Sequence, residues 1–95
     1  MSPTIVVRHN SAALRYETEV AGHLAVTEYR LEGDCVIFTH TLVPPELRGR
    51  GVPEALVKTA LEETRDQNRR VIAQCSYVAK FIHRNPEFQF LLRND

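Results

Sequence analysis

The chain has 95 residues, of which 43% are apolar and 25% are charged, so we expect one small globular domain spanning residues 1–95. Twelve basic residues balance twelve acidic ones, and this composition gives no reason to expect a nucleic-acid or anionic-membrane partner. No apolar run reaches membrane-spanning length and the N-terminus lacks a signal-peptide core, so a cytoplasmic protein is expected.

Four strands are predicted in the first half of the chain. A β-branched run covers residues 5–8, and alternating apolar residues mark two further strands over 13–20 and 23–31. The most apolar strand covers residues 35–43. Short turns that contain glycine separate the last three strands, which is typical of an antiparallel meander.

The second half is predicted to alternate between helix and strand. Pro44 and Pro45 end the fourth strand, because proline has no backbone N–H to donate. A helix follows over residues 53–68, then a strand over 70–75, and Ser76 is placed to cap a second helix. The first helix has one apolar stripe, made of Val52, Leu56, Val57, Ala60, Leu61 and Thr64.

This order, β-β-β-β-α-β-α, predicts an α/β (α+β) fold with a mixed, mostly antiparallel sheet. The strand–helix–strand crossover over residues 39–75 should make the fourth and fifth strands parallel. If these two strands splay apart at the loop end, they form a cleft that faces the helix N-terminus. Near the C-terminus Phe88, Phe90 and Leu92 alternate, which fits an edge strand or a last helical turn.

Two glycines and two arginines lie where the fourth strand ends and the first helix begins, in the sequence Arg48-Gly49-Arg50-Gly51. Glycines let the backbone approach a ligand, a helix N-terminus offers unpaired N–H groups, and guanidinium groups supply positive charge. This combination favours a phosphate site over an ordinary exposed loop.

With its neighbours from Val43 to Val52, this loop resembles the acetyl-CoA loop of the GCN5-related N-acetyltransferases (GNAT), whose signature is Gln/Arg-x-x-Gly-x-Gly/Ala. Two further segments, Cys75-Ser76-Tyr77 and Pro86-Glu87-Phe88, resemble motifs of a short, single-domain subgroup of that family. The resemblance covers most of the chain, with the strongest part between residues 39 and 88. It implies a minimal GNAT-like fold and an acetyl-CoA-dependent N-acetyltransferase.

The resemblance also implies where CoA would bind. The edge of the fourth strand around Leu42 and Val43 would hold the pantetheine in the manner of an added strand. The thioester would lie between the fourth and fifth strands. Lys80 is a candidate contact for a CoA phosphate; the alternative is that it is an ordinary solvent-exposed residue. The backbone amides that would receive the pyrophosphate belong to Leu47, Arg48, Gly49, Arg50, Gly51 and Val52.

Two departures from the family pattern bear on function. Pro53 stands where the family has Gly or Ala and removes one phosphate donor, so binding should depend more on the two arginines. Short members often carry Glu where this chain has Leu42, so a carboxylate base is missing there. The alternative to an enzyme is a CoA- or acyl-CoA-binding or sensing module with little turnover.

Two residues are candidates for catalysis. Cys75 ends the fifth predicted strand before a helix N-terminus, which favours a thiolate; it either takes the acetyl group or only lines the pocket. His40 would accept a proton from an ammonium acceptor. Strand alternation places His40 and Leu42 on one face and Thr41 on the other, so only one of these sets can face the acceptor.

The remaining expectations concern the cysteines, the aromatic residues, the acceptor and the oligomeric state. Cys35 and Cys75 have no metal-type spacing, so free thiols and no metal site are expected. Tyr77 and Phe81 are interpreted as core residues. The acceptor is an amine on a small molecule or a protein, of unknown identity, because the helices that shape the acceptor site in larger family members are absent. The protein is expected to be a monomer or a weak homodimer.

Overall fold

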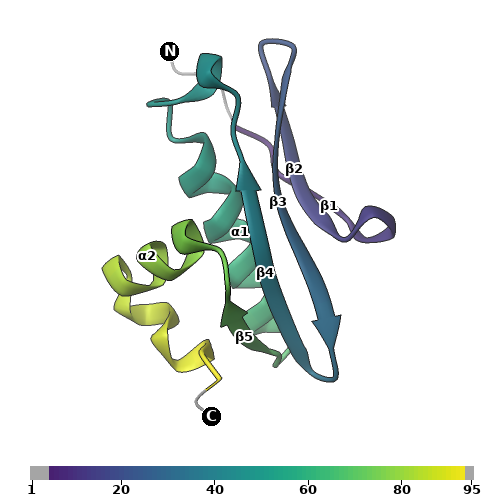
Figure 1. Cartoon of the computed structure of the whole chain (residues 1–95), viewed down its shortest axis with the longest axis vertical. Helices are drawn as coiled ribbons and strands as arrows, with labels where there is room; N and C mark the ends of the chain where they lie inside the picture. Colours follow the sequence, from purple (N-terminus) through teal and green to yellow (C-terminus); the bar gives the residue numbers. More distant parts are fainter. Residues whose placement is uncertain (1–4, 94–95) are drawn as a thin grey trace.

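A computed structural model describes residues 5–93 of the chain (Figure 1). One sheet contains all five strands in sequence order, with antiparallel pairs up to β4 and a parallel β4–β5 pair. The predicted order and mixed sheet are therefore confirmed. The strands are β1 (Arg8–Asn10), β2 (Arg15–Val20), β3 (His23–Glu32), β4 (Cys35–Leu42) and β5 (Arg70–Ala73). The helices are α1 (Val52–Asp66) and α2 (Ser76–Arg84), with short 3-10 helices η1 (Ser11–Ala13), η2 (Pro45–Leu47) and η3 (Pro86–Leu91).

Three local predictions need correction. The first strand lies at Arg8–Asn10 rather than at residues 5–8, because it is Arg8–Asn10 that pairs with β2. Ser76 does not cap α2: it is the first helical residue, and Cys75 occupies the cap position without a side-chain hydrogen bond. The C-terminal segment combines both alternatives, since η3 is followed by a parallel bridge between Leu92 and Val71.

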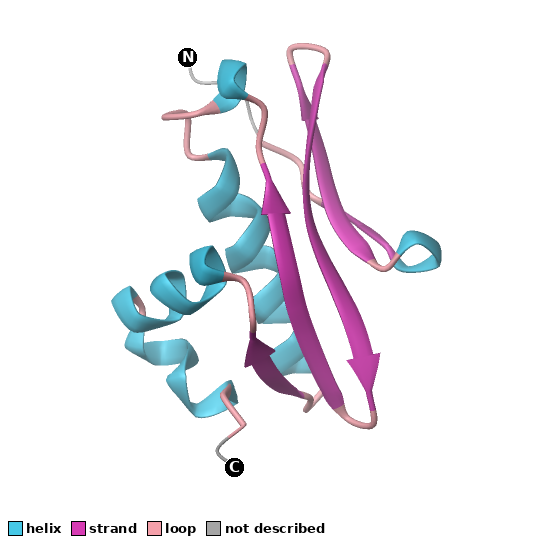
Figure 2. Cartoon of the chain, in the orientation of Figure 1, coloured by secondary structure: helices cyan, strands magenta, loops and turns pink. Residues whose placement is uncertain are grey.

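The core lies between α1 and one face of the sheet. The six residues of the predicted apolar stripe are the buried residues of α1, as a 3.6-residue period requires. They pack against alternate strand residues such as Tyr16, Ala25, Tyr29 and Phe38. Figure 2 shows α1 behind the sheet, while the opposite face of β3 and β4 carries no helix. Among residues 5–93, no helix is both long enough and apolar enough to cross a bilayer.

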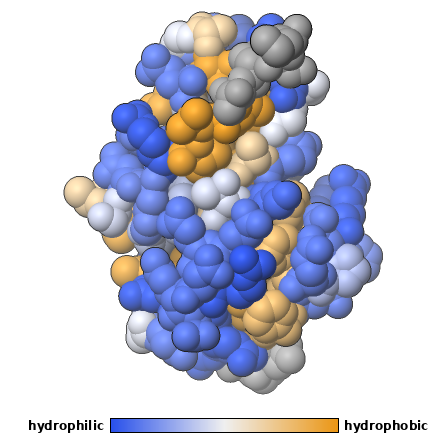
Figure 3. Space-filling view, turned by 180° about the vertical axis from the view of Figure 1, so that it is seen from behind, coloured by the Kyte–Doolittle hydropathy of each residue, from blue (hydrophilic) through white to orange (hydrophobic). Residues whose placement is uncertain are grey.

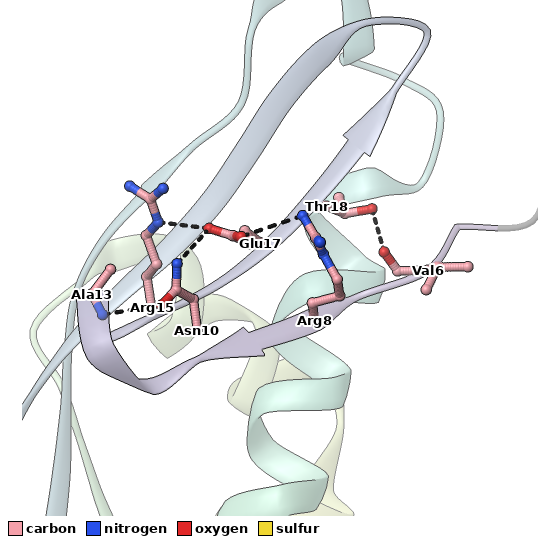
Figure 4. Close-up of polar contacts among 7 residues, drawn as sticks. All are labelled: Val6, Arg8, Asn10, Ala13, Arg15, Glu17 and Thr18. Atoms are coloured by element: carbon pink, nitrogen blue, oxygen red, sulfur yellow. Dashed lines mark hydrogen bonds and ion pairs between the residues drawn. The ribbon is translucent and has the colours of Figure 1, made fainter.

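The face of the sheet opposite α1, called here the outer face, is stabilised by charge pairing around Glu17 (Figure 4). Glu17 is 8% exposed, and its carboxylate accepts from Arg15 Nε at 2.8 Å, Asn10 Nδ2 at 3.3 Å and Arg8 Nη2 at 3.4 Å. The hydrogen bonds from Arg15 and Asn10 hold the pKa of Glu17 below its usual value. Strand pairing brings these donors together, because Arg8 lies opposite Glu17 in the β1–β2 ladder.

Glu17→Gln is expected to destabilise the fold at neutral pH, and the difference from the wild-type protein should shrink in acid. A depressed pKa stabilises the folded state above the unfolded value of about 4.5, and this contribution is lost as the pH falls through the folded value. Urea unfolding between pH 3 and pH 7 measures the effect. The matched control is Glu19→Gln, which removes an exposed carboxylate from the same strand and face. Parallel pH curves for the two variants would contradict the pairing.

Candidate functional site

The parallel β4–β5 pair ends before β4 does. Its last pair is Phe38 with Ala73, and the Phe38 carbonyl accepts from the backbone N–H groups of both Gln74 and Cys75. β4 continues to Leu42, so no strand of residues 5–93 lies beside its edge over residues 39–42 on the β5 side. Figure 1 shows the chain leaving β5 toward α2 while β4 runs on. The predicted splay between these strands is present, and it leaves backbone groups to which an extended ligand can bind.

A β-bulge lies at the start of this unpaired edge. Glu28 of β3 pairs with His40, but the next residue, Tyr29, pairs with Phe38, so Thr39 is an extra residue in β4. A bulge bends a strand and reverses the faces of the residues beyond it. Phe38 and Thr41 therefore both lie on the α1 face, while His40 lies on the outer face.

The loop before α1 is exposed and has unpaired backbone groups. Leu47 and Val52, both fully buried, anchor its two ends, whereas all four residues between them are exposed. Gly49 and Gly51 have φ values of +77° and +75°, a region that other residues rarely adopt, and Gly51 is the N-cap of α1. Within the described residues, no hydrogen bond uses the amides of residues 49–52, and neither Arg48 nor Arg50 forms an ion pair.

Helix α1 adds to this site through its N-terminus. The first hydrogen bond of the helix runs from Ala55 N to the Gly51 carbonyl, which leaves the preceding amides directed toward the loop. Pro53 occupies the second helical position, where its missing N–H interrupts no intrahelical bond but supplies no donor to a ligand. The loop therefore combines unpaired amides, the positive end of a helix and two guanidinium groups, which together suit a phosphate group.

Cys75 lies beside the unpaired edge of β4. It is 8% exposed, and its Sγ donates to Thr41 Oγ1 at 3.4 Å. Thr41 Oγ1 also lies 2.8 Å from Thr27 Oγ1 of β3, so the three side chains form a short polar chain across the strands. The structure thus places the thiol at the cleft expected for the thioester. Cys35 is also buried, but it belongs to the other end of β4.

His40 and Leu42 do not meet Cys75. Both are exposed on the outer face, where His40 Nδ1 lies 3.8 Å from Glu28 Oε1. The side chain that faces the cysteine across the cleft is Thr41 instead. The sequence predicted that only one face of β4 can face the acceptor. In the structure Thr41 lies on the face of Cys75, and His40 and Leu42 lie on the outer face.

A groove of about 400 Å³ runs between α1 and α2. Figure 3 shows it from the helix side as an apolar strip between hydrophilic ridges. Lys80 lies in this groove, where Lys58 and Arg84 provide two more cations. Its remaining lining comes from Glu54, Ala55, Tyr77, Phe81 and Asn85.

Tyr77 and Phe81 pack against the core, as interpreted from the sequence, but the groove that they also line was not predicted. Both are half-buried and line the groove, while the fully buried residues of α2 are Val78 and Ile82. Burial and the neighbouring Glu54 carboxylate raise the pKa of Tyr77 to about 12, so its hydroxyl keeps its proton at neutral pH. The spacing of Tyr77, Lys80 and Arg84 on one helical face was the signal available in the sequence.

Comparison with known proteins agrees with this geometry. A family model described as GCN5-related N-acetyltransferase matches residues 15–91. Protein NATD1 from Bos taurus is 33% identical over 92 residues, which cover 94% of this chain and 81% of that protein. Protein NATD1 from Xenopus tropicalis is 30% identical over 95 residues, with 97% and 87% covered.

The fold also matches a solved structure. The solution structure of a GCN5-like protein from Staphylococcus aureus superposes with a TM-score of 0.74 at 24% identity, covering 95% of this chain and 89% of that one. The family match spans the loop, the splayed strands and Cys75 together. The chain belongs to the GCN5-related N-acetyltransferase family.

Proposed function

We propose that this protein transfers an acetyl group from acetyl-CoA to an amine. The observation that supports the proposal most directly is that the unpaired edge of β4 and the unpaired loop before α1 follow one another. The free edge of β4 leads, through Pro44 and Pro45, to the loop whose amides at residues 49–52 and whose arginines have no partner among the described residues. A ligand with an extended amide-containing arm and a pyrophosphate matches both, because strand edges bind amides and helix N-termini bind phosphates.

In this proposal the pyrophosphate binds at the amides of residues 49–52, with the Arg48 and Arg50 side chains supplying charge. The expected amide donors Leu47 and Arg48 are corrected, because their N–H groups already donate to the carbonyls of Pro44 and Pro45 in η2.

The pantetheine lies along β4 near Leu42 and Val43, which directs the thioester toward Cys75. The groove between α1 and α2 receives a further phosphate, and Lys80 is the proposed contact, supported by the cations of Lys58 and Arg84 in the same lining.

Two routes for the acetyl group fit this arrangement. In the first, the Cys75 thiolate attacks the carbonyl carbon, CoA leaves as a thiolate, and the amine then displaces Cys75. In the second, the amine attacks the thioester directly while Cys75 only lines the pocket. Either way the ammonium form of the acceptor must lose two protons. His40 is the proposed acceptor of the first, before the attack, and the departing thiolate takes the second as the amide forms. Holding the thioester and the amine together supplies most of the rate gain.

Binding and turnover test the proposal separately. CoA should raise the melting temperature of the protein progressively with concentration, since a ligand that binds only the folded state stabilises it. Mass spectrometry of pooled amines incubated with acetyl-CoA should then reveal an acetylated product. No change in melting temperature at saturating CoA would exclude the proposed site.

Intact-mass measurement distinguishes the two routes. We expect an acetyl adduct that hydroxylamine removes, because Cys75 lies where the thioester is proposed to bind and thioesters are labile to hydroxylamine. The adduct should disappear in Cys75→Ala and persist in Cys35→Ala, the matched control for the other buried thiol. A fully active Cys75→Ala protein without an adduct would assign the transfer to direct attack.

One observation favours a second candidate, a CoA-binding or acyl-CoA-sensing module with little turnover. The thiol at the cleft contacts the hydroxyl of Thr41 rather than a carboxylate, and Leu42 points to the outer face. A sensor would bind CoA tightly and yield no acetylated product with any amine, whereas the transferase forms product.

A further inference from the structure

Three side chains form a continuous line of polar atoms that starts at the cleft, called here the hydroxyl chain. Cys75 Sγ lies 3.4 Å from Thr41 Oγ1, which lies 2.8 Å from Thr27 Oγ1. Thr27 Oγ1 lies in turn 3.4 Å from the backbone carbonyl oxygen of His40. Thr27 and Thr41 are directly opposite each other in the β3–β4 ladder, and the bulge at Thr39 places Thr41 on this face. The fold thus connects the thiol to a fully buried hydroxyl.

Thr27 differs from the other buried threonines in its closest partner. Thr18 and Thr64 donate to backbone carbonyl oxygens at 2.7 Å and 2.8 Å. Thr27 is 0% exposed, and its closer partner is the side-chain hydroxyl of Thr41 rather than a backbone carbonyl. A valine at this position would have no polar group to satisfy in the core. The hydroxyl of Thr27 is therefore directed at Thr41, which contacts the thiol.

The hydrogen bonds of the hydroxyl chain can reverse their direction. While Cys75 is a thiol, its S–H donates to Thr41, the Thr41 hydroxyl donates to Thr27, and the Thr27 hydroxyl donates to the His40 carbonyl. Each hydroxyl has one hydrogen, which turns about the Cβ–Oγ bond, and two acceptor lone pairs. When the thiol ionises, rotation of both hydroxyls lets Thr27 donate to Thr41 and lets Thr41 donate to the sulfur. This reversal requires no movement of a heavy atom.

The Thr41 hydroxyl is the side-chain donor available to a thiolate at Cys75. Among residues 5–93, no hydrogen bond or ion pair joins the thiol to a charged side chain, and His40 lies on the outer face. Cys75 is the N-cap of α2, so the positive end of that helix favours the thiolate as well. Hydrogen bonds to an ionised group are about twice as strong as those between neutral groups. Reversal of the hydroxyl chain therefore stabilises the thiolate more than the thiol.

We infer that Thr41 and Thr27 are positioning residues for Cys75, whose hydroxyls accept from the thiol in the resting protein and donate toward the thiolate when it forms. This inference rests on the proposed function and deepens its covalent route. The thiol proton passes to solvent, the thiolate attacks the carbonyl carbon of acetyl-CoA, and the carbon–sulfur bond to CoA breaks. CoA leaves as a thiolate and takes a proton from solvent, so the acetyl group exchanges one thioester for another.

Alkylation of Cys75 by iodoacetamide tests the inference without CoA. Cys35→Ala serves as the background, so that Cys75 is the one remaining thiol, and intact mass is followed over time between pH 6 and pH 10. Thr41→Val should slow alkylation about tenfold at neutral pH, the size of one lost hydrogen bond to an ionised group. The difference should vanish at high pH, where the thiol is ionised in both proteins. Thr41→Ser retains the hydroxyl and should restore the background rate.

Thr27→Val tests the second member of the hydroxyl chain. It should slow alkylation about threefold at neutral pH, because Thr27 acts only through Thr41. Thr18→Val is the matched control: Thr18 is buried on the neighbouring strand, but its hydroxyl donates to the Val6 carbonyl, and the variant should react at the background rate. Circular dichroism verifies that each variant is folded at the temperature used. Equal rates for Thr41→Val and Thr18→Val, or a Thr41→Ser protein as slow as Thr41→Val, would overturn the inference.

Acetyl-CoA separates this inference from the proposed function. The hydroxylamine-labile adduct on Cys75 should form more slowly in Thr41→Val than in the background protein and at the background rate in Thr41→Ser. Alkylation that depends on Thr41, with no acetyl adduct in any variant, would overturn the covalent route and retain the hydroxyl chain. An adduct that forms equally fast with and without the Thr41 hydroxyl would retain the covalent route and overturn the role of the two threonines.

Discussion

Replacing Arg48 and Arg50 together by alanine is expected to lower the affinity for CoA by about 10- to 100-fold. Both side chains are exposed and unpaired within the described residues, so they are available to a phosphate. Hydrogen bonds to charged groups are worth about 1.5–3 kcal/mol each, and solvent reduces that value at an exposed loop. Titration calorimetry at two salt concentrations measures the loss, and the variant should show the weaker salt dependence.

The control for this experiment is Arg65→Ala. Arg65 lies near the C-terminal end of α1, away from the loop, where its Nε is 3.2 Å from Asp66 Oδ1, and its replacement should leave CoA affinity unchanged. The double variant should melt at the wild-type temperature, because neither arginine contacts the core. A folded double variant with wild-type affinity would remove the loop from the CoA site.

Leu47→Ala is expected to lower the free energy of unfolding by about 2–5 kcal/mol, the usual cost of a leucine-sized cavity in a core. Leu47 is 0% exposed although it lies in η2, between the end of β4 and the glycine–arginine loop. Small domains have a total stability of about 5–15 kcal/mol, so this loss is a large share. Urea unfolding measures it directly.

Removal of the Leu47 side chain should also lower the affinity for CoA. Leu47 and Val52 hold the two ends of the loop, so we expect Leu47→Ala to weaken CoA binding even at temperatures where the protein remains folded. Leu31→Ala is the matched control: Leu31 is 45% exposed, and removing it should change stability by about 0.5 kcal/mol or less. Equal destabilisation by the two substitutions would show that η2 is not anchored in the core.

Long periodic segments of this chain were predictable because one physical signal dominates in each. The stripe of α1 repeats every 3.6 residues, and its buried residues are the six that the sequence indicates. Short or mixed segments were not. The first strand is defined by pairing of Arg8–Asn10 with β2 rather than by the β-branched residues before it. Tyr77 and Phe81 pack against the core as interpreted, but only the contact between α1 and α2 shows that their other sides line a groove.

By itself, the sequence determined the order of the elements, the crossover and the glycine–arginine loop at the start of α1, since local periodicity and turn chemistry specify these features. Tertiary structure alone decided which residues of β4 face Cys75. Simple alternation puts His40 on the same face as Phe38, but the bulge at Thr39 separates them, so that Thr41 faces the thiol and His40 faces Glu28. A bulge arises from the register between two strands, and the residues of one strand contain no signal for it.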